Sequence, residues 1–199
     1  MQVILLDTRY FKSRMNADKR SDEEKKKLNL VGWYVPNNDP EATILGAEQW
    51  KWLEEQLKQP ADLRIIASSI QVIADEKGME SWGNAPRERE RLYKLIESTG
   101  ANGVLFISGD VHFSEISQVD DGPYPFVDFT SSGLTNSEPS WAAAVNSHRT
   151  SPIAYAKPTF GLIDVDWSKP SPTVTLEAIG VGGEVAFRQE LTLDQLKAK

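Results

Sequence analysis

Three short apolar runs, separated by segments with helical spacing, constrain the possible folds of this chain more than any other feature. The runs are Val3 to Leu6, Leu63 to Ser68 and Gly103 to Ser108. Each has the length of a strand, and a continuously apolar run is typical of a strand that is buried on both faces of a sheet. The runs therefore predict three neighbouring strands of a largely buried sheet.

Two amphipathic helices are predicted between these strands. Over Gly46 to Gln59, apolar residues recur every three or four positions, as on one face of a helix. A second helix is predicted with Asn84 as its N-cap, Pro86 in its first turn and Gly100 near its end. The alternation of strand and helix predicts an α/β sheet with helices packed on it.

The second half of the chain has the pattern of a β-rich region. Residues 12 to 43 are read as a long excursion with one short helix, and Leu193 to Lys199 as a short closing helix. The predicted strands are Glu115 to Val119, Phe126 to Thr130, Thr159 to Trp167, Thr173 to Ala178 and Val185 to Glu190. The 199 residues are expected to form one domain, with an α/β part over 1–113 and a β-rich part over 114–199.

Charge and composition exclude several classes of function. The net charge of −7 and the pI near 5.0 argue against broad binding to a nucleic acid polymer, which needs a basic surface. The absence of cysteine excludes disulfides, zinc-thiolate sites and a cysteine nucleophile. The apolar runs are too short for a transmembrane segment, and the N-terminus lacks the pattern of a signal peptide.

The segment Ser108-Gly109-Asp110-Val111-His112 is the most informative for function, because it follows a predicted buried strand directly. Ligands in α/β sheets gather at the carboxyl ends of strands. If the segment is extended, Asp110 and His112 project to one side and Val111 into the fold, while Gly109 lets the backbone turn closely. A carboxylate and an imidazole so placed could bind metal ions, although a helix cap and a loop histidine are the simpler explanation.

Gly109-Asp110-Val111-His112 resembles the Gly-Asp-x-His motif of the C-terminal half of alkaline phosphatase D (PhoD-like) metallophosphoesterases. Further blocks resemble the same family, in family order, over nearly the whole chain. They are Leu6 to Phe11, Leu45 to Leu53, Ser68 to Val72, Glu80 to Asn84 with Glu88-Arg89, and Asp128 to Gly133. The resemblance implies part of an α/β/β/α metallophosphoesterase sandwich, in which Asp110 and His112 are catalytic ligands of a dinuclear metal site.

What the resemblance implies for function is a metal-dependent phosphoester hydrolase, either a phosphomonoesterase or a phosphodiesterase, that uses a metal-activated hydroxide. The cofactors would be two divalent or trivalent ions, and iron, calcium, manganese and zinc all remain open. The partner would be a small phosphoester substrate. Relatives are often exported, so a periplasmic or extracellular location is implied, with the cytoplasm left open.

The chain departs from the family pattern in its metal ligands. Relatives begin with another half that provides further ligands, and no second motif of that kind occurs in this sequence. We therefore expect an isolated chain of low activity, completed by an N-terminal half or a second chain. The alternative is a catalytically inactive fragment that acts as a structural or partner-binding module. Such a fragment would expose a large apolar patch or form oligomers.

Four further residues are candidate substrate contacts, each with a simpler explanation. Arg89 could bind phosphate bidentately and Trp82 could lie at the mouth of the site, but a surface ion pair and a core tryptophan are more common. Ser131 and Ser132, together with Thr130, could donate hydrogen bonds to phosphate oxygens, although a Ser-Ser-Gly stretch after a strand is usually a turn.

Two other pairs of residues are read mainly as structural. Asp7 and Arg9 are expected to form an ion pair with each other. His148 and Arg149 could form a lid over the cleft, but a solvent-exposed loop pair is the favoured interpretation. A serine-hydrolase mechanism has no support, because no Gly-x-Ser-x-Gly motif occurs.

Overall fold

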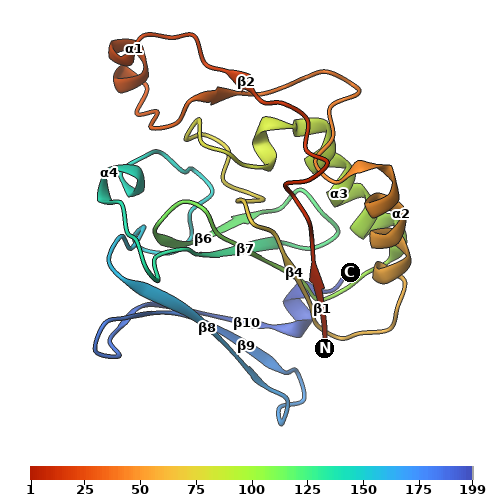
Figure 1. Ribbon diagram of the computed structural model, residues 1–199. Helices are drawn as coiled ribbons and strands as arrows, with labels where there is room; N and C mark the ends of the chain where they lie inside the picture. The colour runs from red at the N-terminus through yellow and green to blue at the C-terminus, as the bar shows by residue number, and fades with distance from the viewer. Residues whose placement is uncertain (199) are drawn as a thin grey trace.

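A mixed five-stranded sheet forms the centre of the computed structural model, which describes residues 1–198 (Figure 1). Its strands, in spatial order, are β1 (Gln2–Leu5), β4 (Arg64–Ala67), β5 (Val104–Ser108), β7 (Phe126–Ser131) and β6 (Ser114–Val119). The first four run parallel, whereas β6 is antiparallel to β7. The sheet therefore combines strands from both predicted parts of the chain.

A second, three-stranded antiparallel sheet follows in the C-terminal part. It contains β8 (Thr159–Asp166), β9 (Thr173–Gly180) and β10 (Val185–Thr192), in the order β10-β9-β8. A small two-stranded ribbon of β2 (Asn16–Ala17) and β3 (Tyr34–Val35) lies in the N-terminal excursion. The predicted β-rich second half is confirmed.

Helices account for the remaining regular structure. They are α1 (Asp22–Lys27), α2 (Gly46–Leu57), the 3₁₀ helix η1 (Trp82–Asn84), α3 (Pro86–Thr99), α4 (Pro139–Ala142) and the 3₁₀ helix η2 (Leu193–Leu196). The predicted closing helix is thus a single 3₁₀ turn.

The start of α3 differs from the prediction, whereas its end agrees with it. Pro86 occupies the first turn and Gly100 closes the helix with φ 65°, a conformation that glycine adopts without strain. The N-cap is Ala85 rather than Asn84. Asn84 ends η1 instead, where its Oδ1 accepts a hydrogen bond from the Ser81 N–H at 2.8 Å.

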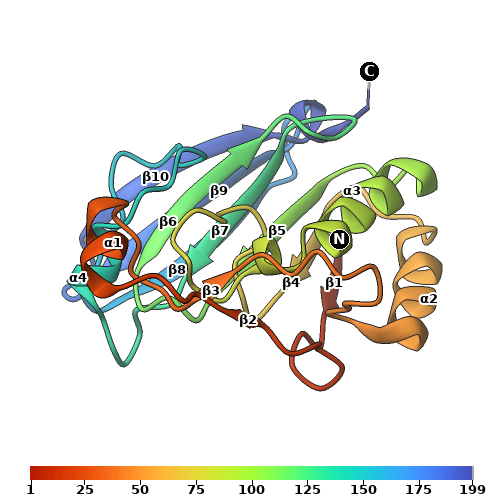
Figure 2. The same ribbon diagram turned by 90° about the horizontal axis from the view of Figure 1, so that it is seen from above.

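Aromatic side chains on opposite faces of β7 show how the layers stack. Phe126 contacts Tyr93 of α3, with ring centroids 4.9 Å apart. Phe129 points to the other face and contacts Phe187 of β10 at 6.4 Å. Helices therefore cover one face of the five-stranded sheet and the three-stranded sheet covers the other. Figure 1 shows β8, β9 and β10 below β6 and β7, and Figure 2 shows α2 and α3 on the side of β1 and β4. One main hydrophobic core joins these layers.

The strand β1 is an edge strand with one exposed face, which corrects the prediction that it is buried on both faces. Within residues 1–198, β1 pairs only with β4. Ile4 is 2% exposed, but Val3 and Leu5 are 61% and 75% exposed. A strand on the outside of a sheet leaves one face uncovered unless another layer lies on it.

The outer face of the three-stranded sheet is also uncovered by α-helix within residues 1–198 (Figure 1). Phe160 and Leu162 of β8 are 48% and 45% exposed. The described residues thus provide three layers of the four-layer sandwich that the resemblance implied.

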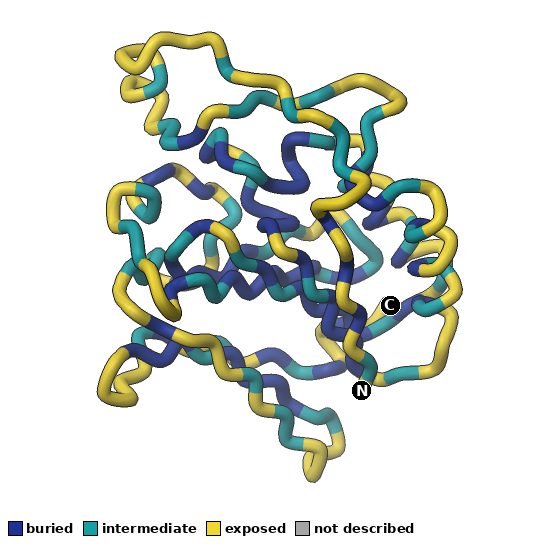
Figure 3. Tube along the Cα trace, in the orientation of Figure 1, coloured by how far each residue is buried: buried dark blue, intermediate teal, exposed yellow. Residues whose placement is uncertain are grey.

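The N-terminal excursion differs from the rest in its burial. Figure 3 shows buried segments gathered in the sheets and in the chain that follows β4, whereas the excursion is mostly exposed or intermediate. None of the helices in residues 1–198 combines the length and the apolar character needed to cross a membrane.

Candidate functional site

Small polar residues line the edge of the sheet where the parallel strands end. The hydroxyls of Thr8, after β1, and Ser69, after β4, lie 2.5 Å apart. Gly109 follows β5 and lies close to Ser69 and Ser132, the residue after β7. A cavity of about 350 Å³ reaches this edge between the two sheets, and Ser69, Gly109 and Ser131 are among its lining residues. The sheet thus brings the predicted residues Ser131 and Ser132 beside Gly109.

The segment after β5 bends sharply instead of remaining extended. Asp110 and His112 have φ values of 76° and 57°, so both lie in the left-handed region, which is unfavourable for residues with a Cβ. The glycine at 109 does not have a positive φ, which corrects its predicted role in the turn. Val111 and Phe113 are fully buried, and they direct Asp110 and His112 outward. Such strain in non-glycine residues is concentrated at functional sites.

Two residues that were not identified from the sequence hold the side chain of His112. Trp141 of α4 stacks on the imidazole with ring centroids 4.9 Å apart and an interplanar angle of 22°. The Nδ2 atom of Asn136 lies 3.3 Å from His112 Nδ1. The backbone is held as well, because Glu138 N–H donates to the His112 carbonyl at 3.0 Å. Both residues come from the segment after β7, so nothing local in the sequence indicated these contacts.

A pair of basic residues accompanies the exposed carboxylate of Asp110. Arg9 and Lys12 both form ion pairs with Oε1 of Glu80. Burial and the charge of Arg9 lower the pKa of Lys12 to about 8, and the carboxylate of Asp110 acts against that shift. Lysines with a lowered pKa beside a carboxylate are frequent in active sites, so Lys12 is a further candidate.

The predicted substrate contacts Trp82 and Arg89 lie elsewhere. Trp82 is fully buried, and its Nε1–H donates to Ser68 Oγ at 3.0 Å. Arg89 donates to Asp75 Oδ2 at 2.7 Å and to the Ile73 carbonyl at 3.1 Å. The structure does not bring either side chain to Asp110 or His112. Both instead support the chain segment between β4 and α3.

The two pairs read as structural have other partners than expected. Asp7 Oδ1 accepts hydrogen bonds from the backbone N–H groups of Arg9 and Tyr10, both at 2.9 Å, while the Arg9 guanidinium pairs with Glu80. His148 Nε2 lies 3.7 Å from Asp75, and Arg149 donates to the buried Glu115 at 2.8 Å. Arg149 is thus anchored to the core and not part of a free loop.

A buried polar network lies behind the site. Asp128 of β7 accepts hydrogen bonds from Ser108 Oγ at 2.7 Å and from the backbone N–H groups of Val72 and Ile73 at 2.8 and 3.2 Å. Burial raises the pKa of Asp128, although these donors act against the shift. Thr130 is also fully buried and hydrogen-bonds to Ser108 Oγ at 2.9 Å, so its hydroxyl serves this network.

Glu115 of β6 is the second buried carboxylate of the network. It accepts hydrogen bonds from Lys77 at 2.6 Å, Arg149 at 2.8 Å, Gln71 at 2.9 Å and Asn146 at 3.0 Å. Burial favours a higher pKa for Glu115, but the charge and hydrogen bond of Lys77, with the other donors, outweigh it and lower the pKa. The network fastens the segment after β4 to the back of β6 and β7.

The residues beside Gly109 fit part of a metal site. A carboxylate and an imidazole are suitable ligands for iron, manganese or zinc. Both side chains point away from the core, and neither forms a salt bridge within residues 1–198. Over the same residues, however, no cluster of three or more His, Cys, Asp or Glu side chains could hold a metal ion. Asp110 and His112 are therefore compatible with a metal centre but supply only part of its ligands.

The mixed α/β fold, with candidate ligand residues directly after a parallel strand, places the chain among α/β proteins with a ligand site at the carboxyl ends of the strands. Comparison with known proteins narrows this class. A family model described as PhoD-like phosphatase matches residues 1–167. The chain belongs to the PhoD-like phosphatase family.

Individual relatives agree with this assignment. Alkaline phosphatase D of Bacillus subtilis (strain 168) is 33% identical over an alignment of 92 residues, and the match covers 42% of this chain and 16% of the relative. A solved structure of PhoD is 19% identical and matches 99% of this chain and 41% of its own, with a TM-score of 0.61. This structural similarity supports the fold alone. The chain spans well under half the length of both proteins.

Proposed function

We propose that this chain supplies part of the active site of a metal-dependent phosphoester hydrolase. The observation that carries the proposal is the geometry of Asp110 and His112. Both residues have a strained left-handed backbone, and both point outward at the carboxyl end of β5. The chain that carries them belongs to a family of phosphatases.

In the proposed site, Asp110 and His112 are ligands of metal ions. When bound, such ions supply an activated water and positive charge for the phosphoryl group. Trp141 and Asn136 hold the imidazole of His112 in place. Fixing a ligand in this way is a common role of residues around metal sites.

Other residues at the strand ends would bind the substrate. Ser131 and Ser132 lie beside Gly109 and offer hydroxyl donors for phosphoryl oxygens. Arg9 and Lys12 would attract the anionic phosphoester toward Asp110 in a protein with a net charge of −7. Phosphomonoesters and phosphodiesters would both contact these side chains.

We further propose that additional polypeptide completes the site and covers the open side of the sheet. Two ligand residues are fewer than a metal centre for catalysis requires. The exposed Val3 and Leu5 also leave apolar surface at the edge of the sheet. The completing polypeptide would cover these side chains and supply the remaining ligands, whether it belongs to the same chain or to another. An extracytoplasmic location is part of the same proposal, since it rests on the family.

The alternative function is that of a partner-binding module without activity of its own. The same two observations favour it, because an incomplete ligand set and an open apolar face also suit a chain whose role is to bind another polypeptide. The two functions differ in whether Asp110 and His112 bind metal.

Metal content and hydrolysis test the proposal together. Metal bound to the purified protein is measured by mass spectrometry, and hydrolysis of p-nitrophenyl phosphate and bis-p-nitrophenyl phosphate is followed with added divalent metals. Because the ligand set of the chain is incomplete, we expect weak metal binding and slow turnover in the wild type, a loss of both in His112→Ala, and little change in His148→Ala, which removes the only other histidine. Metal content that is equal in the two variants would overturn the proposal, and a wild type that binds no metal would favour the partner-binding alternative.

A further inference from the structure

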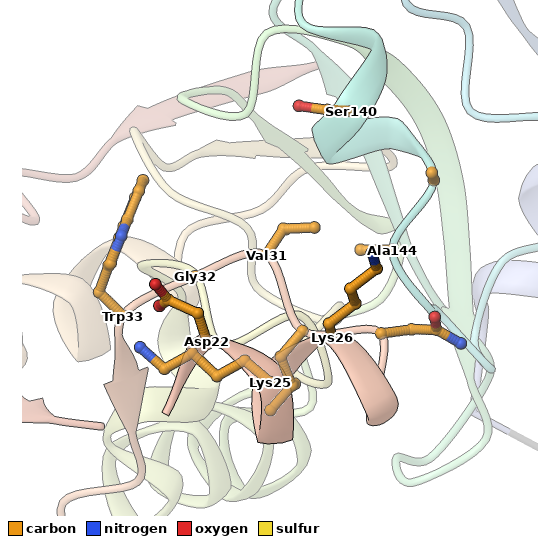
Figure 4. Close-up of a pocket in the computed structure, with 11 residues that line it drawn as sticks. Asp22, Lys25, Lys26, Val31, Gly32, Trp33, Ser140 and Ala144 are labelled. Carbon is orange, nitrogen blue, oxygen red and sulfur yellow. The ribbon is translucent and has the colours of Figure 1, made fainter. Parts of the chain in front are cut away.

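A second, larger pocket lies between the N-terminal excursion and α4. Its volume is about 590 Å³. In Figure 4, Asp22, Lys25 and Lys26 of α1 lie on one side and Ser140 of α4 lies on the other, with Val31 between them. None of the residues predicted from the sequence to form the site lines this pocket. Its position nevertheless connects it to His112.

Two aromatic contacts link the pocket to the candidate metal ligand. Trp33, which lines the pocket and is 52% exposed, contacts Trp141 with ring centroids 6.0 Å apart. Trp141 in turn stacks on His112. Val31, also in the pocket lining, packs in the small hydrophobic cluster that buries Val111. The pocket is therefore connected to the proposed reaction site by two aromatic contacts, from Trp33 to Trp141 and from Trp141 to His112.

Backbone hydrogen bonds hold one wall of the pocket in place. The N–H groups of Val31 and Gly32 both donate to the Lys77 carbonyl, at 3.1 and 3.0 Å. A Cβ at Gly32 would lie 1.9 Å from the Gly78 carbonyl oxygen, so the two segments approach as closely as glycine permits. Lys77 itself is fixed through Glu115. Such a pre-formed wall is typical of small-molecule sites.

The lining combines apolar surface with unpaired positive charge. Trp33, Val31 and Ala144 provide apolar contacts. Within residues 1–198, Lys27 pairs with Glu23, whereas Lys25 and Lys26 have no salt-bridge partner. The lining thus contains two lysines, Lys25 and Lys26, and one carboxylate, Asp22, so its net charge is positive. An apolar group on an anionic molecule matches this combination in shape and charge.

We propose that this pocket binds the alcohol moiety of the substrate, and that this moiety is an apolar aromatic group. The inference rests on the proposed phosphoester hydrolysis, since the phosphoryl group would lie at Asp110 and His112. The aromatic group would then lie against Trp33, and Lys25 and Lys26 would attract the anionic ester. The enzyme would accordingly prefer aryl phosphoesters to esters of small polyols.

Binding measured by NMR tests the pocket without requiring turnover. The ¹⁵N-labelled chain, in the absence of metal, is titrated with 1-naphthyl phosphate, glycerol 3-phosphate and inorganic phosphate. We expect 1-naphthyl phosphate to shift the Trp33 indole N–H and the amides of Gly32 and Ala144, and the other two probes to leave them unchanged. Trp33→Ala should weaken binding of 1-naphthyl phosphate about 3- to 10-fold.

A matched control is Trp52→Ala, because Trp52 is a partly exposed tryptophan on α2 outside the pocket. It should leave the affinity unchanged. Equal affinities in the two tryptophan variants, or equal shifts with 1-naphthyl phosphate and glycerol 3-phosphate, would overturn the inference. The proposed function would be contradicted by a different result, the absence of bound metal and of turnover. The NMR titration depends on neither bound metal nor turnover.

Discussion

Asp110 and His112 show at the residue scale how this turn differs from one built for stability. Side chains with a Cβ cost roughly 1–2 kcal/mol in the left-handed region, and glycine avoids that cost. Gly109 is adjacent to the turn but does not take up the unusual conformation. The left-handed conformation is instead adopted by Asp110 and His112, the two residues whose side chains could bind metal. This is the pattern expected where function, and not stability, determines which residue occupies a position.

Asp110→Gly should therefore stabilise the protein. We expect the free energy of unfolding to rise by about 0.5 to 1 kcal/mol, because the relief of strain exceeds the greater flexibility of glycine in the unfolded chain. Asp110→Asn should be close to neutral, since asparagine tolerates this conformation, and Asp110→Val should be destabilising. Urea denaturation of the three variants measures the order. A glycine variant less stable than the wild type would show that the carboxylate makes a favourable contact.

The segment between β4 and α3 is the element that most depends on buried polar groups. Asp128 and Glu115 hold it from the sheet, and Lys77, the residue that pairs with Glu115, belongs to the segment itself. Buried ionic groups stabilise only when all of them are satisfied, so the loss of one partner is costly. The same segment supports the wall of the larger pocket through the Lys77 carbonyl.

Glu115→Gln should destabilise the protein by roughly 3–5 kcal/mol, because it leaves the buried ammonium of Lys77 without its counter-charge. Thermal unfolding of this variant can be compared with that of Glu97→Gln, which changes an exposed glutamate on α3 and should stay within about 0.5 kcal/mol of the wild type. Equal stabilities of the two variants would contradict the structural role of the network.

Asp128 should give the stability a distinct dependence on pH. Burial raises its pKa in the folded protein, so between the ordinary aspartate pKa of 3.8 and the folded pKa the unfolded state binds fewer protons. Stability should therefore fall as the pH rises through this range. Asp128→Asn should remove that fall, as measured by urea unfolding between pH 4 and 8. The exposed Asp120→Asn serves as the control, and an identical pH dependence in both variants would refute the assignment.

The sequence predicted well those features that depend on local pattern. The strand before Gly109, the helix α2 and the glycine at the end of α3 follow from apolar spacing and turn residues. Long-range features were missed, because Trp141 and Asn136 reach His112 only through the tertiary fold. Trp82 was misread since a tryptophan in a family block can be preserved for packing as well as for binding. The metal role of Asp110 and His112 remains a prediction.

At the scale of the whole molecule, the edge formed by β1 governs behaviour in solution. The apolar run Val3 to Leu6 suggested burial on both faces, but the pattern of a strand does not reveal which layers cover it. Val3 and Leu5 lie exposed next to an unpaired strand edge. Such edges promote pairing between chains.

We expect the purified chain to self-associate and Leu5→Lys to reduce that association, because a charge on an edge strand opposes pairing. Leu5 is 75% exposed, so the substitution should change the free energy of unfolding by less than about 0.5 kcal/mol. Sedimentation velocity over a range of concentrations measures the effect. Leu28→Lys, at a 54% exposed leucine in the excursion, is the control. A wild type that stays monomeric throughout would argue against an open interface.

The pairing of β1 with β4 also affects the order of events during synthesis. Gln2 has its register partner at Arg64, so β1 cannot pair with β4 until the excursion and α2 have been made. Parallel pairing between segments so distant in sequence is slow, because a long loop must close first. At a synthesis rate of roughly 5–20 residues per second, β1 would remain unpaired with β4 for several seconds. During this interval β1 is accessible to chaperones and prone to misassembly.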